Sequence, residues 1–265
     1  MNKPWVKGDP NGYKLLTPGP LTTSLGVREA MLVDRCTWDD DYKAMTQEIR
    51  ASLLEIAHAD PKDYAAVLMQ GSGTFGVESV LSSIPSKDDT VLVLVNGAYS
   101  ERMIAIMERE GVAHERLDFA WDEIPDAGKL GEYFDVHPEV TYVSMVHSET
   151  TSGILNDIES VGREVRKRSL KLVVDAMSSF GAVDIDVPEI GIDFLISSAN
   201  KCIQGVRASR SSSPAARCLR PPRATPARSR STSTTSTKPW SATAASGASP
   251  PRPTWSRPSA PRSTA

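Results

Sequence analysis

The chain has 265 residues and a formal net charge of −3, and it is long enough for one large domain or two. Its three cysteines, Cys36, Cys202 and Cys218, are too few and too scattered for a disulfide framework or a metal site. The N-terminal sequence MNKPWVKGDPNGYKLL has no apolar secretory core and no run reaches membrane-span length, so we expect a soluble, cytoplasmic protein without a membrane partner.

Apolar runs of strand length recur along residues 1–206, and each ends in small or polar residues. Their hydrophobicity is continuous rather than alternating, which is typical of strands buried on both faces of a sheet. Helical segments separate them, so the pattern predicts an α/β fold around a mostly parallel sheet. The expected strands are 64–70, 90–97, 140–147, 170–176 and 193–199, and the expected helices are 42–59, 74–84, 98–111 and 158–169.

The first strand end reads QGSGT, at the edge of the sheet where ligands bind in such folds. Ser72, Gly73 and Thr74 follow the strand and open a helix. Backbone N–H groups at a helix N-terminus suit a phosphate, so this is a candidate phosphate site. Gly/Ser turns before helices are common, and the motif alone does not identify one. No GK[ST] sequence follows, which excludes a Walker P-loop.

The next two strand ends carry an aromatic residue and a polar cluster. Tyr99 follows the second strand, where packing at a helix start is the simplest explanation for it. The sequence HSETTSG at 147–153 places a histidine, a carboxylate and several hydroxyl groups in one turn. Taken alone, His147 is more typical of a buried structural histidine than of a catalyst.

Asp175 and Lys201 form the most informative pair of strand-end residues. Asp175 directly follows a buried strand, where a carboxylate is costly without a cationic partner. Lys201 follows the next strand, and a lysine removed from water becomes a usable amine nucleophile for Schiff-base chemistry. Pyridoxal phosphate requires such a lysine, an acid for its ring nitrogen and a phosphate site. The combination therefore predicts this cofactor.

Several motifs together resemble the class V aminotransferases of fold type I, which use pyridoxal phosphate. CTWDDDY and ISSANKCIQGV are similar to the 2-aminoethylphosphonate–pyruvate transaminase family in particular. The resemblance implies that residues 1–206 form the large, pyridoxal-phosphate-binding domain of such an enzyme, with a sheet of the seven-stranded type. The other matching motifs are LLTPGPLTTS, LMQGSGT, VNGAYSERM, MVHSETTSG and VVDAMSSFGA.

The resemblance also implies roles for individual residues. Lys201 would bind the cofactor covalently and carry a proton, and Asp175 would keep the ring nitrogen protonated. Tyr99 would stack on the ring, with Met177 near its other face. The remaining implied residues are Ser72, Gly73 and Thr74 for the phosphate, Thr151 or Ser152 for the 3′-oxygen side, and Thr17 and Gly19 for the substrate.

The implied reaction transfers the amino group of 2-aminoethylphosphonate to pyruvate and yields phosphonoacetaldehyde and L-alanine. A related class V enzyme that uses alanine, serine or glyoxylate is the alternative within the family. The resemblance implies a homodimer for the complete fold. A non-enzymatic scaffold would not need both Lys201 and Asp175 at adjacent strand ends.

Residues 207–265 differ in composition from the rest of the chain. They contain 11 Lys and Arg and no Asp or Glu, so residues 1–206 hold all 33 acids and only 19 bases. A sequence this rich in Ser, Arg and Pro cannot bury a core, and we expect a disordered tail without a strand. The alternative from another functional class is a nucleic-acid-binding arm. The arginines are dispersed and interrupted by prolines, so we expect no nucleic-acid partner.

A shift of reading frame explains the break at Arg207. Permitted codons for residues 207–214, read with one base restored, give PGFAFVIA, which is similar to the strand that follows the lysine in this family. The same shift of residues 242–255 gives NGRKWRFTSPTHV, again similar to a family segment. We therefore hypothesise that residues 207–265 are an out-of-frame translation. On this hypothesis the large domain is incomplete, and the chain binds the cofactor poorly and is inactive.

Overall fold

The computed structural model describes residues 14–206 and the backbone of a strand at 214–219. The strands are β1 (Ala65–Gln70), β2 (Thr90–Val95), β3 (His114–Asp118), β4 (Val140–Val146), β5 (Ser148–Glu149), β6 (Ile154–Leu155), β7 (Lys171–Asp175), β8 (Phe194–Ser198) and β9 (Pro214–Leu219). The helices are α1 (Leu25–Ala30), α2 (Asp40–Ile56), α3 (Gly73–Leu81), α4 (Ala98–Glu110), α5 (Ala127–Val136), α6 (Ile158–Lys167) and α7 (Val187–Ile190).

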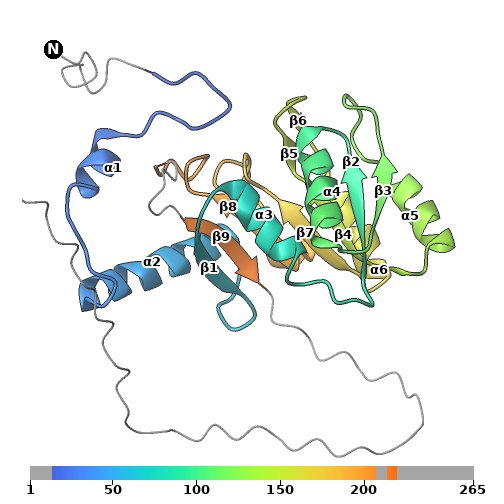
Figure 1. The fold of residues 1–265 in the computed structure, drawn as a ribbon, viewed down its shortest axis with the longest axis horizontal. Coiled ribbons are helices and arrows are strands. Elements are labelled where there is room, and N and C mark those ends of the chain that lie inside the picture. The colour runs from blue at the N-terminus through green and yellow to red at the C-terminus, as the bar shows by residue number, and fades with distance from the viewer. Residues whose placement is uncertain (1–13, 207–213, 220–265) are drawn as a thin grey trace, which may run out of the picture. The chain divides into compact units, whose positions relative to one another are not determined.

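Seven strands form one sheet in the order β1-β9-β8-β7-β4-β2-β3 (Figure 1). The pairs β2–β3, β2–β4, β4–β7 and β7–β8 are parallel, whereas β9 is antiparallel to both β1 and β8. The short strands β5 and β6 form a separate antiparallel pair beside the end of β4. These pairings confirm the predicted α/β fold with a mostly parallel sheet.

Two buried apolar clusters lie on the two faces of this sheet, because successive strand residues point in opposite directions. Val93 of β2 packs in a cluster with side chains of α3 and α4. Its neighbour Leu92 packs in the other cluster, with side chains of α2, α5 and α6. Both side chains are fully buried, and burial of such a side chain contributes roughly 1.5–3 kcal/mol to folding. Continuous apolar strands are therefore required here, as the sequence pattern indicated.

Local signals set the ends of the helices that reach the site. The hydroxyl of Ser72 accepts a hydrogen bond from the backbone N–H of Phe75 at 3.2 Å and caps the start of α3. Helix α4 ends at Glu110 and is capped by Gly111, whose φ of 68° is a left-handed conformation that glycine adopts without a Cβ penalty. Since α3 and α4 start directly after β1 and β2, their N-termini lie at the carboxyl edge of the sheet.

Strand β9 differs from the sequence-based expectation. No strand was expected after Val206, yet the backbone of residues 214–219 pairs with β1 on one side and β8 on the other. Ladder pairing uses backbone N–H and C=O groups, and β1 and β8 each present a row of them, so an apolar sequence is not required. The expectation of disorder is therefore wrong for these six residues. The rest of the predicted tail, 207–213 and 220–265, lies outside the described residues.

Candidate active site

A cavity of about 260 Å³ opens at the carboxyl edge of the sheet. Its wall includes residues that follow β1, β2, β7 and β8, because parallel strands end at the same edge. Among the residues singled out from the sequence, those on this wall are Gly19, Ser72, Gly73, Thr74, Tyr99, Asp175, Met177 and Lys201. Segments more than 180 residues apart along the chain thus meet around one space.

The N-terminus of α3 forms one part of the wall. Ser72 caps this helix, and Gly73 and Thr74 occupy its first turn, where backbone N–H groups have no partner within the helix. A Cβ at position 73 would lie 2.6 Å from the sulfur of Met177, so a larger residue would require the end of that side chain to move. The first turn of α3 therefore offers N–H donors and hydroxyl groups to an anion, in the way expected of a phosphate site.

Asp175 lies at the end of β7 and is almost completely buried, with 4% of its surface exposed. One carboxyl oxygen accepts a hydrogen bond from the backbone N–H of Met177 at 2.9 Å. The pKa of Asp175 is raised to about 6, mainly by burial and to a smaller extent by the charge of Glu149, while the Met177 N–H, Lys201 and Arg102 act in the opposite direction. A desolvated carboxyl of this kind is stabilised in its charged form by a cation that enters the cavity.

Lys201 lies three residues beyond β8 and is half-buried. Its Nζ donates a hydrogen bond to the backbone oxygen of Pro18 at 3.0 Å. The adjacent residue Gly19 is packed against the lysine, since a Cβ there would lie 2.6 Å from Nζ. The loop at residues 17–20 therefore borders the amine and limits the space around it.

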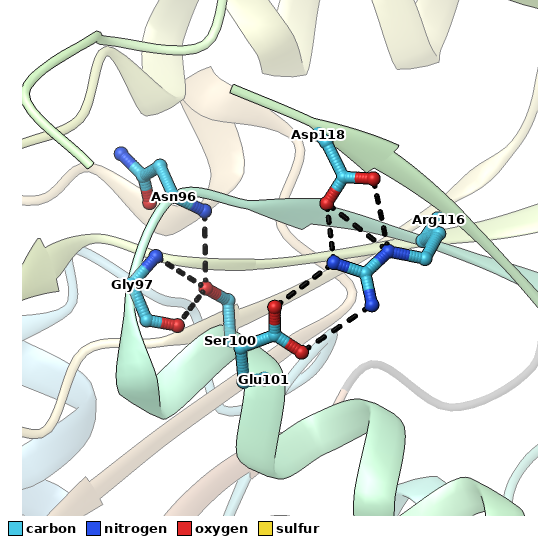
Figure 2. Close-up of polar contacts among 6 residues, drawn as sticks. All are labelled: Asn96, Gly97, Ser100, Glu101, Arg116 and Asp118. Carbon is cyan, nitrogen blue, oxygen red and sulfur yellow. Dashed lines mark hydrogen bonds and ion pairs between the residues drawn. The ribbon is translucent and has the colours of Figure 1, made fainter. Parts of the chain in front are cut away.

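Tyr99 lines the wall and follows the tight turn between β2 and α4. Figure 2 shows that turn at Asn96 and Gly97, together with Ser100. The fully buried hydroxyl of Ser100 accepts hydrogen bonds from the backbone N–H groups of Asn96 at 3.2 Å and Gly97 at 3.1 Å. The same hydroxyl donates to the carbonyl of Gly97 at 2.9 Å. These bonds fix the backbone on both sides of the turn, and Tyr99 is therefore held at the start of α4.

Arg102 is a functional candidate that sequence reasoning missed. It lies one turn after Tyr99 on α4, lines the same cavity, and its guanidinium carbon lies 4.9 Å from the centre of the Tyr99 ring. Its Nη1 donates a hydrogen bond to the hydroxyl of Thr74 at 3.2 Å. The spacing of three residues on a helix, which places Arg102 on the same face as Tyr99, was the available signal.

Thr17, Thr151 and Ser152 do not lie among the residues that line the cavity. The hydroxyl of Thr17 donates to the carbonyl of Pro20 at 3.2 Å, and that of Thr151 donates to Glu149 at 2.6 Å. Ser152 is exposed to solvent. The roles that the sequence predicted for these three residues stay predictions.

The wall carries a hydroxyl pair that the sequence analysis did not single out. Thr150 and Ser178 lie on it, and their hydroxyl oxygens are 3.1 Å apart. They come from the turn after β5 and from the segment after Asp175, so no sequence spacing brings them together. The neighbouring residue in the sequence, Thr151, points away from the cavity toward Glu149.

His147, at the end of β4, is buried and does not line the cavity. Burial lowers the pKa of His147 to about 4, which keeps the imidazole neutral near pH 7. Its Nδ1 has no hydrogen-bond partner among the described residues. A neutral, enclosed ring that does not line the cavity favours the structural role for this histidine.

Comparison with known proteins places the chain in a family. The profile of the family described as "Aminotransferase class-V" matches residues 37–206, which is more than half of the chain. The chain belongs to the class V aminotransferases.

Two kinds of feature are absent from the described part of this aminotransferase. It contains no group of three or more His, Cys, Asp or Glu side chains that could hold a metal ion. None of the helices described has the length and apolar character needed to span a membrane.

Several curated relatives of this class V aminotransferase carry the name 2-aminoethylphosphonate–pyruvate transaminase. The protein from Lysinibacillus sphaericus is 50% identical over 196 residues, which are 74% of this chain and 54% of the relative. The protein from Aeromonas hydrophila is 50% identical over 198 residues, 73% of this chain and 52% of the relative. The chain thus spans about half the length of the curated relatives it matches.

Solved structures show the same fold at lower sequence identity. Alanine–glyoxylate aminotransferase from Nostoc has a TM-score of 0.70 and 23% identity, over 83% of this class V chain and 58% of that chain. Ureidoglycine–glyoxylate aminotransferase from Bacillus subtilis has a TM-score of 0.68 and 24% identity, over 77% of this chain and 51% of that chain. The mostly parallel sheet is therefore that of the class V aminotransferases.

Class V aminotransferases depend on pyridoxal phosphate, and the residues on the cavity wall fit that cofactor. The first turn of α3 offers donors to a phosphate, and Lys201 offers an amine to an aldehyde. The buried carboxyl of Asp175 forms no ion pair with a side chain in the described structure, and a protonated ring nitrogen would supply a paired cation. Tyr99 supplies an aromatic face. The phosphate donors, the amine, the carboxyl group and the aromatic ring that the cofactor requires thus come from one wall.

Proposed function

We propose that the cavity of this chain is a pyridoxal phosphate site and that, in the enzyme with its reading frame restored, it serves the transfer of an amino group from 2-aminoethylphosphonate to pyruvate. The observation that carries the proposal is that Lys201, Asp175 and the first turn of α3 line one cavity. The names of relatives at about 50% identity support the choice of substrates.

Each wall residue has a defined task in this proposal. Ser72, Gly73 and Thr74 bind the phosphate through backbone N–H groups and hydroxyls at the positive end of α3. Asp175 accepts a hydrogen bond from the ring nitrogen and, as the counter-ion of that cation, holds its proton in place. Tyr99 packs against the ring and excludes water from one of its faces.

Lys201 has two tasks that its position allows. Its Nζ would be the amine that holds the cofactor, and as a free amine on the wall it would be a base for the proton that must move during transfer. Bound pyridoxal phosphate supplies the aldehyde carbon and the electron-accepting ring for this chemistry. The amino group that 2-aminoethylphosphonate loses, in becoming phosphonoacetaldehyde, is the one that pyruvate gains in becoming L-alanine.

Borohydride trapping tests cofactor binding independently of turnover. The chain is incubated with pyridoxal phosphate and reduced, and mass spectrometry locates the pyridoxyl group. We expect the modification at Lys201 and its loss in Lys201→Ala. Lys171→Ala is the matched control and should leave trapping intact. The Nζ of Lys171 lies 3.1 Å from a carboxyl oxygen of Asp193, and neither residue lines the cavity. Modification spread over several surface lysines would contradict the proposal.

A panel of amino donors tests the substrate assignment. Alanine formation from pyruvate is measured, in the enzyme with its reading frame restored, with 2-aminoethylphosphonate, serine and other amino acids as donors. We expect 2-aminoethylphosphonate to be preferred. A preference for serine or alanine with glyoxylate as acceptor would instead favour the alternative within class V, for which the fold of the glyoxylate aminotransferases is the supporting observation.

Two further proposals concern the whole protein. The family relation leads us to propose a homodimer, which light scattering of the purified chain tests. The composition of residues 207–265 leads us to propose an out-of-frame translation, which resequencing of the gene around codon 207 tests. An intact frame that encodes RASRSSSP in independent isolates would overturn the second proposal.

A further inference from the structure

Glu149 is a carboxyl group enclosed inside the protein beside the cavity. It is the second residue of β5 and has no solvent-exposed surface. Charged groups are rarely buried in this way unless hydrogen bonds and opposite charge replace the lost water. No Lys, Arg or His pairs with it within the described residues, so another source must compensate it.

Backbone and hydroxyl donors surround this carboxylate. Oε2 accepts a hydrogen bond from the backbone N–H of Tyr99 at 3.2 Å. Oε1 accepts from the backbone N–H of Thr151 at 3.2 Å and from its hydroxyl at 2.6 Å. Since Tyr99 is in the first turn of α4, the positive end of that helix faces the carboxylate and stabilises its negative charge. In each of these hydrogen bonds the carboxylate is the acceptor, as its chemistry requires.

Gly97 makes this approach sterically possible. A Cβ at position 97 would lie 2.3 Å from Cγ and 2.4 Å from Cδ of Glu149. The φ of Gly97 is 173°, an extended value open to any residue, so the requirement for glycine comes from the space taken by the carboxylate. The helix start and Glu149 are therefore in direct van der Waals contact.

The carboxylate connects two segments that carry wall residues. On one side it holds Tyr99 at the start of α4, and on the other it holds the turn that contains Thr150. The hydroxyl of Thr151 adds a second bond between these segments, because it also accepts from the backbone N–H of Ala98 at 3.3 Å. Neither Glu149 nor Thr151 lines the cavity itself.

We propose that Glu149 is a positioning residue that clamps the start of α4 to the turn after β5 and thereby sets the spacing between the ring of Tyr99 and the hydroxyl of Thr150 on the cavity wall. The geometry rests on the contacts above, and its consequence for ligand binding rests on the proposed function. The negative charge of Glu149 also raises the pKa of Asp175, which ties the clamp electrostatically to the same wall.

Hydrogen exchange of the ligand-free chain tests the clamp directly. In Glu149→Gln an NH₂ group replaces one of the two carboxylate oxygens. It cannot accept the hydrogen bond that this oxygen received from a backbone N–H. We therefore expect at least one of the backbone amides of Tyr99 and Thr151 to exchange about 10-fold faster or more, as expected for loss of a hydrogen bond to a charged group. Exchange in β4 and β7 should stay unchanged. Glu101→Gln, an exposed glutamate on the first turn of the same helix, is the control and should leave Thr151 unaffected.

Cofactor trapping gives the second measurement. We expect Glu149→Gln to raise the pyridoxal phosphate concentration for half-maximal trapping at Lys201 about 10-fold, again the equivalent of one such bond. If the parent chain traps no cofactor, the proposed function fails, whereas the exchange measurement still decides the clamp. Unchanged exchange at both amides, or acceleration spread evenly over the fold, would overturn the clamp.

Thr151→Val provides a milder variant if Glu149→Gln fails to fold. It removes one donor to Glu149 and the acceptor of the Ala98 N–H, but leaves the carboxylate and its bond to Tyr99. We expect faster exchange at Ala98 and weaker trapping than in the parent chain. Unchanged exchange at Ala98 would count against the clamp.

Discussion

The side-chain amine of Lys201 donates a hydrogen bond to the backbone oxygen of Pro18, with 3.0 Å between the two atoms. The same N-terminal loop is bound to the lysine segment a second time, by a bond of 3.4 Å from the N–H of Leu21 to the carbonyl of Asn200. These contacts close the cavity on the side of the amine. The loop is therefore part of the surroundings of Lys201, and changes in it should alter the reactivity of that residue.

Gly19→Ala should impair the reaction of Lys201 with an aldehyde. Gly19 has a φ of +140°, which side chains rarely adopt, and the new Cβ would lie 2.6 Å from Nζ. We expect the rate of pyridoxyl trapping at Lys201 to fall about 10-fold, with far-UV circular dichroism unchanged. Gly26→Ala is the control, because nothing lies within 4 Å of its Cβ position and its φ is not positive. An equal rate in both variants would refute the role of the loop.

Arg102→Ala should weaken binding of the phosphorylated cofactor selectively. The guanidinium donates to the hydroxyl of Thr74 at the N-terminus of α3, so its charge lies beside the proposed phosphate site. We expect the dissociation constant of pyridoxal phosphate to rise about 10-fold and that of pyridoxal to change little. Fluorescence titration with each compound measures both. Arg109→Ala, on the same helix and paired with Glu78, is the control. An equal loss for the two ligands would contradict this prediction.

Asp175 and His147 should influence the pH dependence of stability in opposite directions. The folded pKa of Asp175, about 6, lies above its usual value of 3.8, so the folded chain favours the neutral acid and loses stability as pH rises from 4 to 6. The folded pKa of His147, about 4, lies below 6.5, so the folded chain favours the neutral ring and gains stability as pH rises through the same range. Each change amounts to about 3 kcal/mol, and the two offset each other in the parent chain.

Single variants should separate these two contributions. As pH rises from 4 to 6, the free energy of unfolding of Asp175→Asn should increase by about 3 kcal/mol relative to that of the parent chain. As pH rises from 4 to 6.5, that of His147→Gln should decrease by a similar amount relative to the parent chain. Urea denaturation at several pH values gives the free energy of unfolding for each. Parallel pH curves for all three proteins would show that neither group titrates as its burial requires.

The turn before α4 should depend on Ser100 far more than on the ion pairs nearby (Figure 2). Ser100→Ala leaves the buried N–H groups of Asn96 and Gly97 without their acceptor, which costs about 1–3 kcal/mol. Arg116 pairs with Glu101 and Asp118 and its pKa is raised by both, yet the cluster is exposed. Arg116→Ala should therefore cost less than about 1 kcal/mol. Thermal denaturation compares them, and a larger effect of Arg116→Ala would contradict the prediction.

The buried strands and the helices between them were predictable to within a few residues. Residues 90–97 were expected as a strand and β2 covers Thr90–Val95, since a strand buried on both faces must be apolar throughout. Strand β3 was missed because it is an edge strand with a sequence, HERLD, that is mostly exposed and lacks an apolar run. Helix α5 was missed too, although Leu130 and Phe134 anchor it to the core.

The residues that lie next to a strand end were predictable as a group, but their orientation was not. Tyr99, Asp175 and Lys201 each follow a strand that the sequence marks, and parallel strands end at one edge. Thr150 and Thr151 are adjacent in the sequence, yet one lines the cavity and the other turns to Glu149. That difference depends on the backbone of a short turn and on a partner 50 residues away, at the start of α4.

The amino-acid sequence by itself determined the α/β class, the parallel strands and the set of strand-end residues that suit pyridoxal phosphate, because burial and strand polarity leave a periodic signal in the chain. Only the tertiary structure decided the place of β9 between β1 and β8, the packing of Gly19 against Lys201 and the role of Glu149. Those features depend on backbone groups and on the space between segments far apart in the chain, and neither leaves a local pattern in the sequence.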